Sequence, residues 1–220
     1  MRIWHSGYCI SLPTKISSVR VRLFAPLYES LEIMEIDYLQ YQTDFKSRIL
    51  ELLKKHSVFT GDFTLSSGKK SNIFVDCKRT LLLSEGHQYV GSYIYNRMRV
   101  EHPEVHKVAG VELGGCPIAS AVASVGPTSI DALYVRKEQK YHGSERLVEG
   151  VYYTGDKVVL VEDVITTGSS TIKALDLLKI CLLKTVAVIS IVDRLEGGVQ
   201  AIEYSHGVPV HSLFTIEDLK

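Results

Sequence analysis

The residues with the clearest capacity for chemistry are two adjacent carboxylates, Glu162 and Asp163, followed by small hydroxyl residues and a glycine. They come after the apolar run Val158–Val161, which is typical of a strand buried on both faces of a parallel sheet. The segment that follows them reads Val164, Ile165, Thr166, Thr167, Gly168, Ser169 and Ser170. Residues 172–180 then have the apolar spacing of a helix.

This order of strand, carboxylates, small loop and helix favours a sugar-phosphate site. Ligands of open α/β sheets bind at the C-terminal ends of the strands. Backbone N–H groups of such a loop and of the helix start attract a phosphate. Carboxylates in front of the loop would repel it, so we expect them to hold ribose hydroxyls or a magnesium ion. The alternative is a plain strand–turn–helix in which Thr and Ser only cap the helix.

Two nucleotide-binding motifs are absent. No G-x-G-x-x-G follows any candidate strand. The nearest match to a P-loop, between Gly61 and Ser71, has the wrong glycine spacing and an extra lysine. A dinucleotide or P-loop site is therefore not indicated.

Two further polar segments follow predicted strands. Arg136, Lys137, Lys140 and His142 come after the strand 132–135, and Arg194 comes after the strand 185–192. A polyanion needs cations beyond backbone donors, and both segments begin at the sheet edge that carries residues 162–170. The alternatives are a solvated charged loop and a simple salt bridge between Arg194 and Asp193.

Four segments resemble a known family. V-L-V-E-D-V-I-T-T-G-S-S resembles the phosphoribosyl-pyrophosphate (PRPP) signature of the type I phosphoribosyltransferases. The segments F-T-L-x-S-G-x-x-S-x-x-x-V-D (63–76), V-R-K-E-x-K-x-H-G (135–143) and V-D-R-x-E-G-G (192–198) are similar to the orotate-specific members. The resemblance covers about residues 36–220.

The resemblance implies Mg²⁺-dependent transfer of 5-phosphoribosyl from PRPP to N1 of orotate, giving orotidine 5′-phosphate and pyrophosphate. It assigns catalytic roles to Lys140, His142 and Asp163, and orotate contacts to Thr166 and Arg194. Mg²⁺ would be held mainly through PRPP. It assigns the PRPP contacts to Arg136, Lys137, Lys140, His142, Glu162, Asp163, Val164, Ile165, Thr166, Thr167, Gly168, Ser169 and Ser170.

The resemblance also implies a homodimer whose loop 136–150 closes over PRPP, partly in the partner's site. Two departures from the family matter. Some members have a lysine where Ser66 stands, and some have one in the turn that here holds Gly114 and Gly115. Pyrophosphate charge must therefore be met elsewhere. A purine or other-base phosphoribosyltransferase and a PRPP-sensing regulator are the alternative functions.

The elements that position these residues alternate along the chain. Alternating strands and helices predict an α/β fold with a doubly wound, mainly parallel sheet, like the type I phosphoribosyltransferases. We expect an N-terminal extension at 1–35, a helix and small hood at 36–80, and a core at 81–220. Helices are expected at 37–56, at 84–100 with Ser84 as its cap, from Pro117, and at 172–180. Strands are expected at 63–65, 73–75, 108–111, 132–135, 158–161, 185–192 and 210–213.

Residues 1–33 differ from the remainder, with frequent serines, four basic residues and no acidic residue before Glu29. They fit a transit peptide, a short extra element packed on the domain, or a chain whose translation begins at Met34. We favour the start at Met34.

Composition limits the remaining possibilities. Lys and Arg total 25, as do Asp and Glu, which argues against general nucleic-acid binding. No apolar run reaches membrane-spanning length. The four cysteines lack metal-ligand spacing, so free thiols in a reducing cytoplasm are expected.

Overall fold

The computed structural model describes residues 38–64, 68, 70–126, 129–137 and 147–220. The chain divides into two units, Met1–Asp44 and Phe45–Lys220. Of the first unit the structure describes only the opening turns of helix α1 (Tyr38–His56). Every other helix and strand belongs to the second unit.

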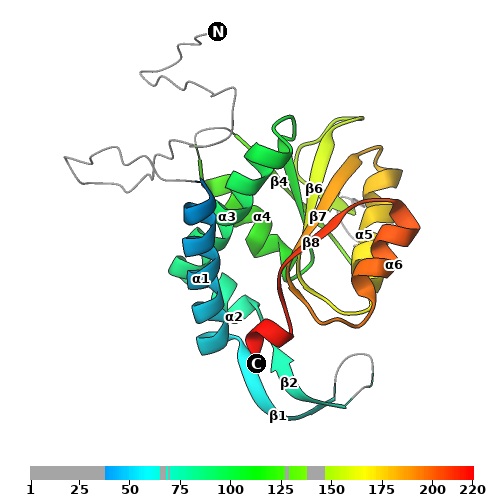
Figure 1. The fold of residues 1–220 in the computed structure, drawn as a ribbon. Helices are drawn as coiled ribbons and strands as arrows, with labels where there is room; N and C mark the ends of the chain where they lie inside the picture. The colour runs from blue at the N-terminus through cyan, green and yellow to red at the C-terminus, as the bar shows by residue number, and fades with distance from the viewer. Residues whose placement is uncertain (1–37, 65–67, 69, 127–128, 138–146) are drawn as a thin grey trace, which may run out of the picture. The chain divides into compact units, whose positions relative to one another are not determined.

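A six-stranded sheet forms the centre of this unit, in the order β5-β4-β3-β6-β7-β8. Figure 1 labels β4, β6, β7 and β8 of this sheet. Five of its strands are parallel, and the short β5 at one edge runs antiparallel to β4. The predicted doubly wound, mainly parallel sheet is confirmed. The strands are β3 (Lys107–Val111), β4 (Asp131–Val135), β5 (Val148–Glu149), β6 (Lys157–Ile165), β7 (Lys184–Asp193) and β8 (Val210–Thr215).

The winding direction reverses between β3 and β6. From β3 the chain moves outward to β4, and it then returns to place β6 on the other side of β3. Such a switch point opens a crevice at the carboxyl ends of the two strands. The acidic pair at the end of β6 therefore lies where this fold binds ligands.

Helices cover both faces of the sheet, and alternating residues of β6 contact the two layers. Val159 and Val161 belong to the apolar cluster that includes α3 and α4, whereas Val158 and Leu160 belong to the cluster that includes α5. Burial on both faces explains the continuous apolar run. The helices are α2 (Lys78–Leu81), α3 (Ser84–Glu101), α4 (Gly115–Ser124), α5 (Ser169–Ile180), α6 (Gly198–His206) and the 3₁₀ helix η1 (Glu217–Leu219).

The hood consists of a separate two-stranded sheet and the residues that lead from it into the start of α2. β1 (Val58–Thr64) pairs antiparallel with β2 (Lys70–Val75), with an irregular register between Thr60 and Phe63. The expected hairpin is confirmed, although β1 begins earlier than the sequence pattern indicated. Ile73 and Val75 point into the core, and this anchors β2 to the body of the unit.

Several helix starts differ from expectation. Leu83, and not Ser84, occupies the N-cap position of α3, and no side chain caps this helix. α4 begins at Gly115, so Pro117 is its third residue. A proline fits there because the first N–H groups of a helix have no partner within it.

Strand ends also differ. β6 runs on to Ile165, so both carboxylates lie inside the strand, and α5 begins three residues earlier than expected. The expected loop 136–150 contains the short strand β5, and the short helix α2 had no sequence prediction. In these places the ends of the elements depend on backbone hydrogen bonds to a neighbouring strand or turn. Apolar periodicity in the sequence does not predict those bonds.

Two negative observations apply to the described part of the chain. None of its helices is both long and apolar enough to cross a bilayer. Cys77, Cys116 and Cys181 are free thiols, as expected.

Candidate functional site

The carboxylate pair lies at the switch point, and the two side chains differ in exposure. Glu162 is buried, with 5% of its surface exposed, whereas Asp163 is partly open. The Asp163 N–H donates to Glu162 Oε1 at 3.2 Å, and the Val164 N–H donates to Asp163 Oδ1 at 2.9 Å. Burial and the nearby Asp163 charge raise the pKa of Glu162 well above its usual range. The pair therefore presents one open carboxylate and one that resists ionisation.

The small-residue loop leads directly into α5. Gly168 has φ 78°, a left-handed conformation that glycine adopts without strain. The Ile172 N–H donates to the Gly168 carbonyl at 2.9 Å, so the N–H groups of residues 169–171 have no carbonyl partner within the helix. Ser169 and Ser170 are exposed beside them. These N–H and hydroxyl groups form a set of hydrogen-bond donors at the positive end of the α5 dipole, where an anion can bind.

These residues line a single pocket of about 390 Å³. Ten of the predicted PRPP contacts line it, Lys137 and residues 162–170, together with Thr171, to which the sequence assigned no contact. Thr171 is buried, and it closes the pocket floor at the first turn of α5. The structure thus brings the acidic pair, the donor loop and one cation of the basic segment together.

The turn after β3 packs against the acidic pair. A methyl group on Gly114 would lie 2.0 Å from Asp163 Oδ2, and one on Gly115 would lie 2.4 Å from the Val161 carbonyl. Both glycines are therefore required for this approach. Glu112 Oε2 accepts the N–H of Lys137 at 3.2 Å, so this turn also holds the start of the basic segment.

A lysine missed at the sequence level borders the acidic pair. Lys78, the first residue of α2, places its Nζ 2.6 Å from Asp76 Oδ1 and 4.0 Å from Asp163 Oδ2. The sequence signal was its position two residues after the V-D that ends the hood motif. The hood therefore brings a cation beside Asp163, although Lys78 is not among the residues that line the pocket.

Arg194 lies on the neighbouring turn, after β7. Its backbone N–H donates to the Ile165 carbonyl at 2.9 Å, which joins this turn to the end of β6. Its Nε pairs with Glu196 Oε1 at 2.9 Å, and Nη2 lies 3.5 Å from Ser71 Oγ on β2. The expected alternative partner, Asp193, instead accepts the N–H of Leu195. Neither Glu196 nor Ser71 was predicted as a partner.

The Arg194 turn and the donor loop are in direct contact. A methyl group on Gly198 would lie 2.4 Å from the Thr166 carbonyl, and one on Gly168 would lie 2.7 Å from the Gly198 carbonyl. The turn that carries Arg194 therefore adjoins the pocket, although Arg194 is not among the residues that line it.

The basic segment is only partly described. Lys140 and His142 lie outside the described residues. Arg136 does not line the pocket; its N–H donates to the Leu147 carbonyl at 2.9 Å and its Nη1 lies 3.8 Å from Glu149 Oε1. The structure thus places Lys137 alone of this group's described residues at the pocket.

The donor set determines which kind of Mg²⁺ site the pocket can form. Among the described residues there is no cluster of three His, Cys, Asp or Glu side chains that could hold a metal by itself. Mg²⁺ commonly uses one or two carboxylates together with substrate phosphates and water. The open carboxylate of Asp163 beside a set of hydrogen-bond donors fits that second kind of site.

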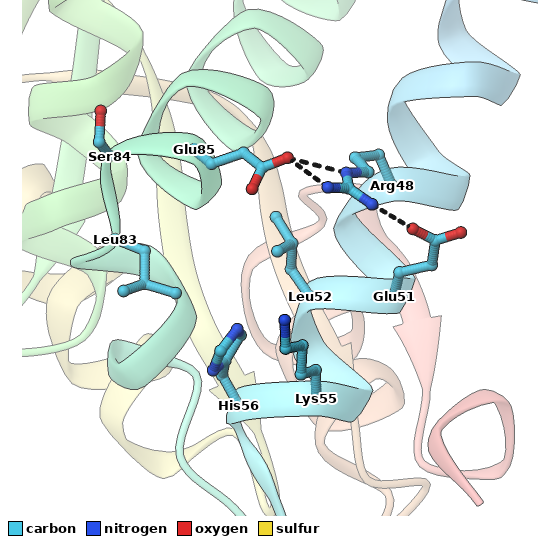
Figure 2. Close-up of a pocket in the computed structure, with 8 residues that line it drawn as sticks. All are labelled: Arg48, Glu51, Leu52, Lys55, His56, Leu83, Ser84 and Glu85. Carbon is cyan, nitrogen blue, oxygen red and sulfur yellow. Dashed lines mark hydrogen bonds and ion pairs between the residues drawn. The ribbon is translucent and has the colours of Figure 1, made fainter.

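A second pocket, of about 400 Å³, lies between α1 and the start of α3 and shares no residue with the first. Figure 2 shows Arg48 at its edge, held by Glu51 at 2.6 Å and Glu85 at 2.7 Å. Those two ion pairs occupy the guanidinium. The described residues that line this pocket include no adjacent acidic pair and no glycine loop, so it does not share the chemistry of the first.

Comparison with known proteins gives a consistent result. The family described as "Phosphoribosyl transferase domain" matches residues 87–209. An "Orotate phosphoribosyltransferase" of Sorangium cellulosum is 46% identical over 178 residues, which are 79% of this chain and 92% of that protein.

Solved structures agree with this. The orotate phosphoribosyltransferase of Mycobacterium tuberculosis, in complex with Fe(III) dicitrate, superposes with a TM-score of 0.70 and 34% identity, covering 80% of this chain and 98% of that one. The same enzyme in complex with PRPP gives a TM-score of 0.66 and 28% identity, covering 80% and 92%.

Proposed function

The chain belongs to the orotate phosphoribosyltransferases, and from this membership we propose how its pocket binds PRPP and orotate and joins them. The activity is transfer of the 5-phosphoribosyl group from PRPP to orotate, a step of pyrimidine biosynthesis. The observation that carries the proposal is the single pocket that joins an acidic pair to a loop of donors at a helix start.

PRPP binds along the pocket. The 5-phosphate lies on Thr166, Thr167, Gly168, Ser169 and Ser170, where loop and helix N–H groups converge. Asp163, and Glu162 behind it, accept the ribose hydroxyls. The backbone of Val164 and Ile165 contacts PRPP between its ribose and its 5-phosphate. The pyrophosphate lies toward Lys137 and the basic segment, which supplies Arg136, Lys140 and His142.

Orotate binds between the Arg194 turn and the hood. The guanidinium of Arg194 is positioned by Glu196 and by Ser71 of β2, two elements that meet at this point. Its planar fork suits a carboxylate. Thr166, on the adjoining loop, contacts the orotate ring.

The reaction breaks the bond between C1 of the ribose and the pyrophosphate oxygen, which keeps the electron pair. N1 of orotate supplies the pair for the new bond and loses its proton. Positive charge develops on the ribose beside Asp163, and negative charge develops on pyrophosphate beside the cations. Groups already fixed near developing charge lower the barrier without reorganising.

Mg²⁺ belongs to this proposal as a partner of PRPP. Asp163 is the residue that would contact it, and the ion would neutralise charge on the leaving pyrophosphate. In this proposal the ion is held mainly by the substrate.

A homodimer with loop 136–150 shared between subunits also belongs to the proposal, as does a cytoplasmic location. The free state of the three described cysteines agrees with a reducing compartment. Size-exclusion chromatography with light scattering tests the dimer, and fractionation of the source cells tests the location.

The decisive experiment mixes the protein with PRPP, Mg²⁺ and orotate and follows the ultraviolet absorbance of orotate. We expect turnover with orotate and none when adenine, guanine, hypoxanthine or uracil replaces it. Chelation of Mg²⁺ should abolish the signal. Turnover of a purine in place of orotate would contradict the proposal, and PRPP binding without turnover of any base would indicate a sensor.

A further inference from the structure

The leaving group of the reaction meets few cations in the described pocket. Among the described residues that line it, Lys137 is the one cation. The turn Glu112–Gly115 packs against Asp163 but carries a glutamate, a leucine and two glycines. Beside the basic segment proposed above, a pyrophosphate leaving next to Asp163 would gain from a cation on another element that borders this carboxylate.

Lys78 is placed to supply that charge. Its Nζ lies 4.0 Å from Asp163 Oδ2, too far for a hydrogen bond but close enough for its charge to act at the pocket. Its hydrogen bond goes to Asp76 Oδ1 at 2.6 Å, on the same short segment. An ammonium has three donors, so two remain after Asp76 is satisfied. Its side chain is 37% exposed, which leaves room for a ligand.

The neighbouring groups keep this lysine charged. Partial burial acts to lower its pKa, but the hydrogen bond to Asp76 and the charge of Asp163 outweigh it and raise the pKa. If Asp163 accepts the ribose 2-hydroxyl, the pyrophosphate lies close by, because it is attached to C1, the carbon next to the C2 that carries this hydroxyl. A flexible lysine beside that carboxylate can reach the pyrophosphate oxygens.

We propose that Lys78 is a further leaving-group residue, a cation carried by the hood that binds the pyrophosphate of PRPP. This rests on the proposed function. No bond to Lys78 forms or breaks: its ammonium donates hydrogen bonds to the oxygen that receives the electron pair from C1. The hood therefore serves the leaving group as well as the base.

Three variants test this. Lys78→Met removes the charge and keeps the length, Lys78→Arg keeps the charge, and Lys55→Met makes the same change at an exposed lysine of the pocket in Figure 2. Steady-state constants for PRPP and orotate are measured, together with calorimetric binding of magnesium pyrophosphate and thermal unfolding.

We expect Lys78→Met to weaken pyrophosphate binding and lower kcat/KM for PRPP by about 10- to 100-fold, the scale of a hydrogen bond to a charged group. The KM for orotate should not change. Lys78→Arg should keep most of the activity, and Lys55→Met should match the wild type. Wild-type pyrophosphate affinity in folded Lys78→Met would overturn the inference. So would equal losses in the Met and Arg variants, which would indicate a structural role through Asp76.

A measurement on the unmodified protein covers the case in which a variant fails to fold. Lysine acetylation followed by mass spectrometry should show that magnesium pyrophosphate slows labelling of Lys78 but not of Lys55. Unchanged labelling of Lys78 at saturating pyrophosphate would overturn the inference. In either experiment, wild-type turnover of orotate is scored separately, so failure of the Lys78 inference is distinguishable from failure of the proposed function.

Discussion

At the scale of single residues, the proposed site holds three anionic groups by different chemistry. In this proposal, backbone donors and small hydroxyls face the 5-phosphate, whereas side-chain cations face the pyrophosphate and the orotate carboxylate. Arg194 shows this most clearly. Only 8% of its side chain is exposed, and Glu196 and Ser71 hold it in place without a ligand. Because Arg194 is already in place before orotate binds, its removal should weaken the binding of orotate more than that of PRPP.

Arg194→Ala should raise the KM for orotate by about 10- to 100-fold, because a charge-assisted hydrogen-bond pair is lost. The KM for PRPP should change little, since the Arg194 backbone bond to Ile165 is retained. Arg194→Lys is the matched control, and it should be intermediate because it keeps the charge without the planar fork. Equal effects on both substrates would remove Arg194 from orotate recognition.

Lys140→Ala should lower kcat by about 30- to 1000-fold, the range for one charge contact that stabilises a transition state. Circular dichroism should match the wild type, because the substitution lies in a charged loop segment without apolar periodicity. The absorbance assay with orotate measures the first effect. Near-normal turnover would take Lys140 out of the mechanism.

Glu162 carries a stability cost that depends on pH. Its folded-state pKa is raised, so the folded protein binds the proton more tightly than the unfolded chain. The stability contributed by protonation is complete below about pH 4.5, the unfolded value, and is lost as pH rises toward the folded-state pKa. A tenfold difference in proton affinity between the two states corresponds to about 1.4 kcal/mol of stability.

Glu162→Gln should therefore unfold at a higher temperature than the wild type at pH 8, with the gap closing near pH 4.5. Its turnover should fall, since the acidic pair is broken. Calorimetric scans across this pH range measure the gap. A gap that is constant with pH would contradict the raised pKa.

At the scale of elements, the site depends on close approaches that only glycine allows. Gly114 faces the end of the Asp163 side chain, whereas Gly198 faces the backbone carbonyl of Thr166. A side-chain end can move at small cost, but a backbone carbonyl in a packed turn cannot. The two contacts therefore predict different consequences for the same substitution.

Gly114→Ala should displace the Asp163 carboxylate and reduce PRPP affinity while leaving the unfolding temperature near that of the wild type. Gly198→Ala should reduce both, with a stability loss of about 1–3 kcal/mol from overpacking. Thermal unfolding and PRPP titration of both variants form the comparison. Equal destabilisation of the two would contradict the distinction between side-chain and backbone contacts.

The elements themselves were largely predictable from sequence. Strand β6 was recognised because burial on both faces leaves an unbroken apolar run, and α5 because its apolar residues recur with helical spacing. Their ends were harder. Whether Ser169 belongs to the loop or to the helix depends on Gly168 and the turn that packs on it, not on periodicity.

At the scale of the whole molecule, the site is assembled from segments distant in the chain. Residues 162–170 were predictable because they are contiguous and their types are specific. Lys78 and Ser71 were not, because their roles arise only when the hood places them beside Asp163 and Arg194. Lys140 and His142 stay predictions, since the described residues do not include them.

A mixing experiment tests whether subunits share their loops. Lys140→Ala and Arg194→Ala are each expected to be weakly active, and they are combined under conditions that exchange the subunits of the proposed homodimer. If the loop acts in the partner's site, a mixed dimer regains one intact site, and random mixing restores about a quarter of wild-type activity. If the loop acts in its own subunit, mixing should restore nothing.

The bond from the Arg194 N–H to the Ile165 carbonyl, with Gly198 pressed on Thr166, has a consequence for protein engineering. The turn proposed to bind orotate is joined to the loop proposed to bind the 5-phosphate, so we expect a turn transplanted from an enzyme with another base preference to disturb both. A change of base preference is better attempted through the side chains of β2. We expect substitutions there to alter the choice of base without weakening PRPP binding.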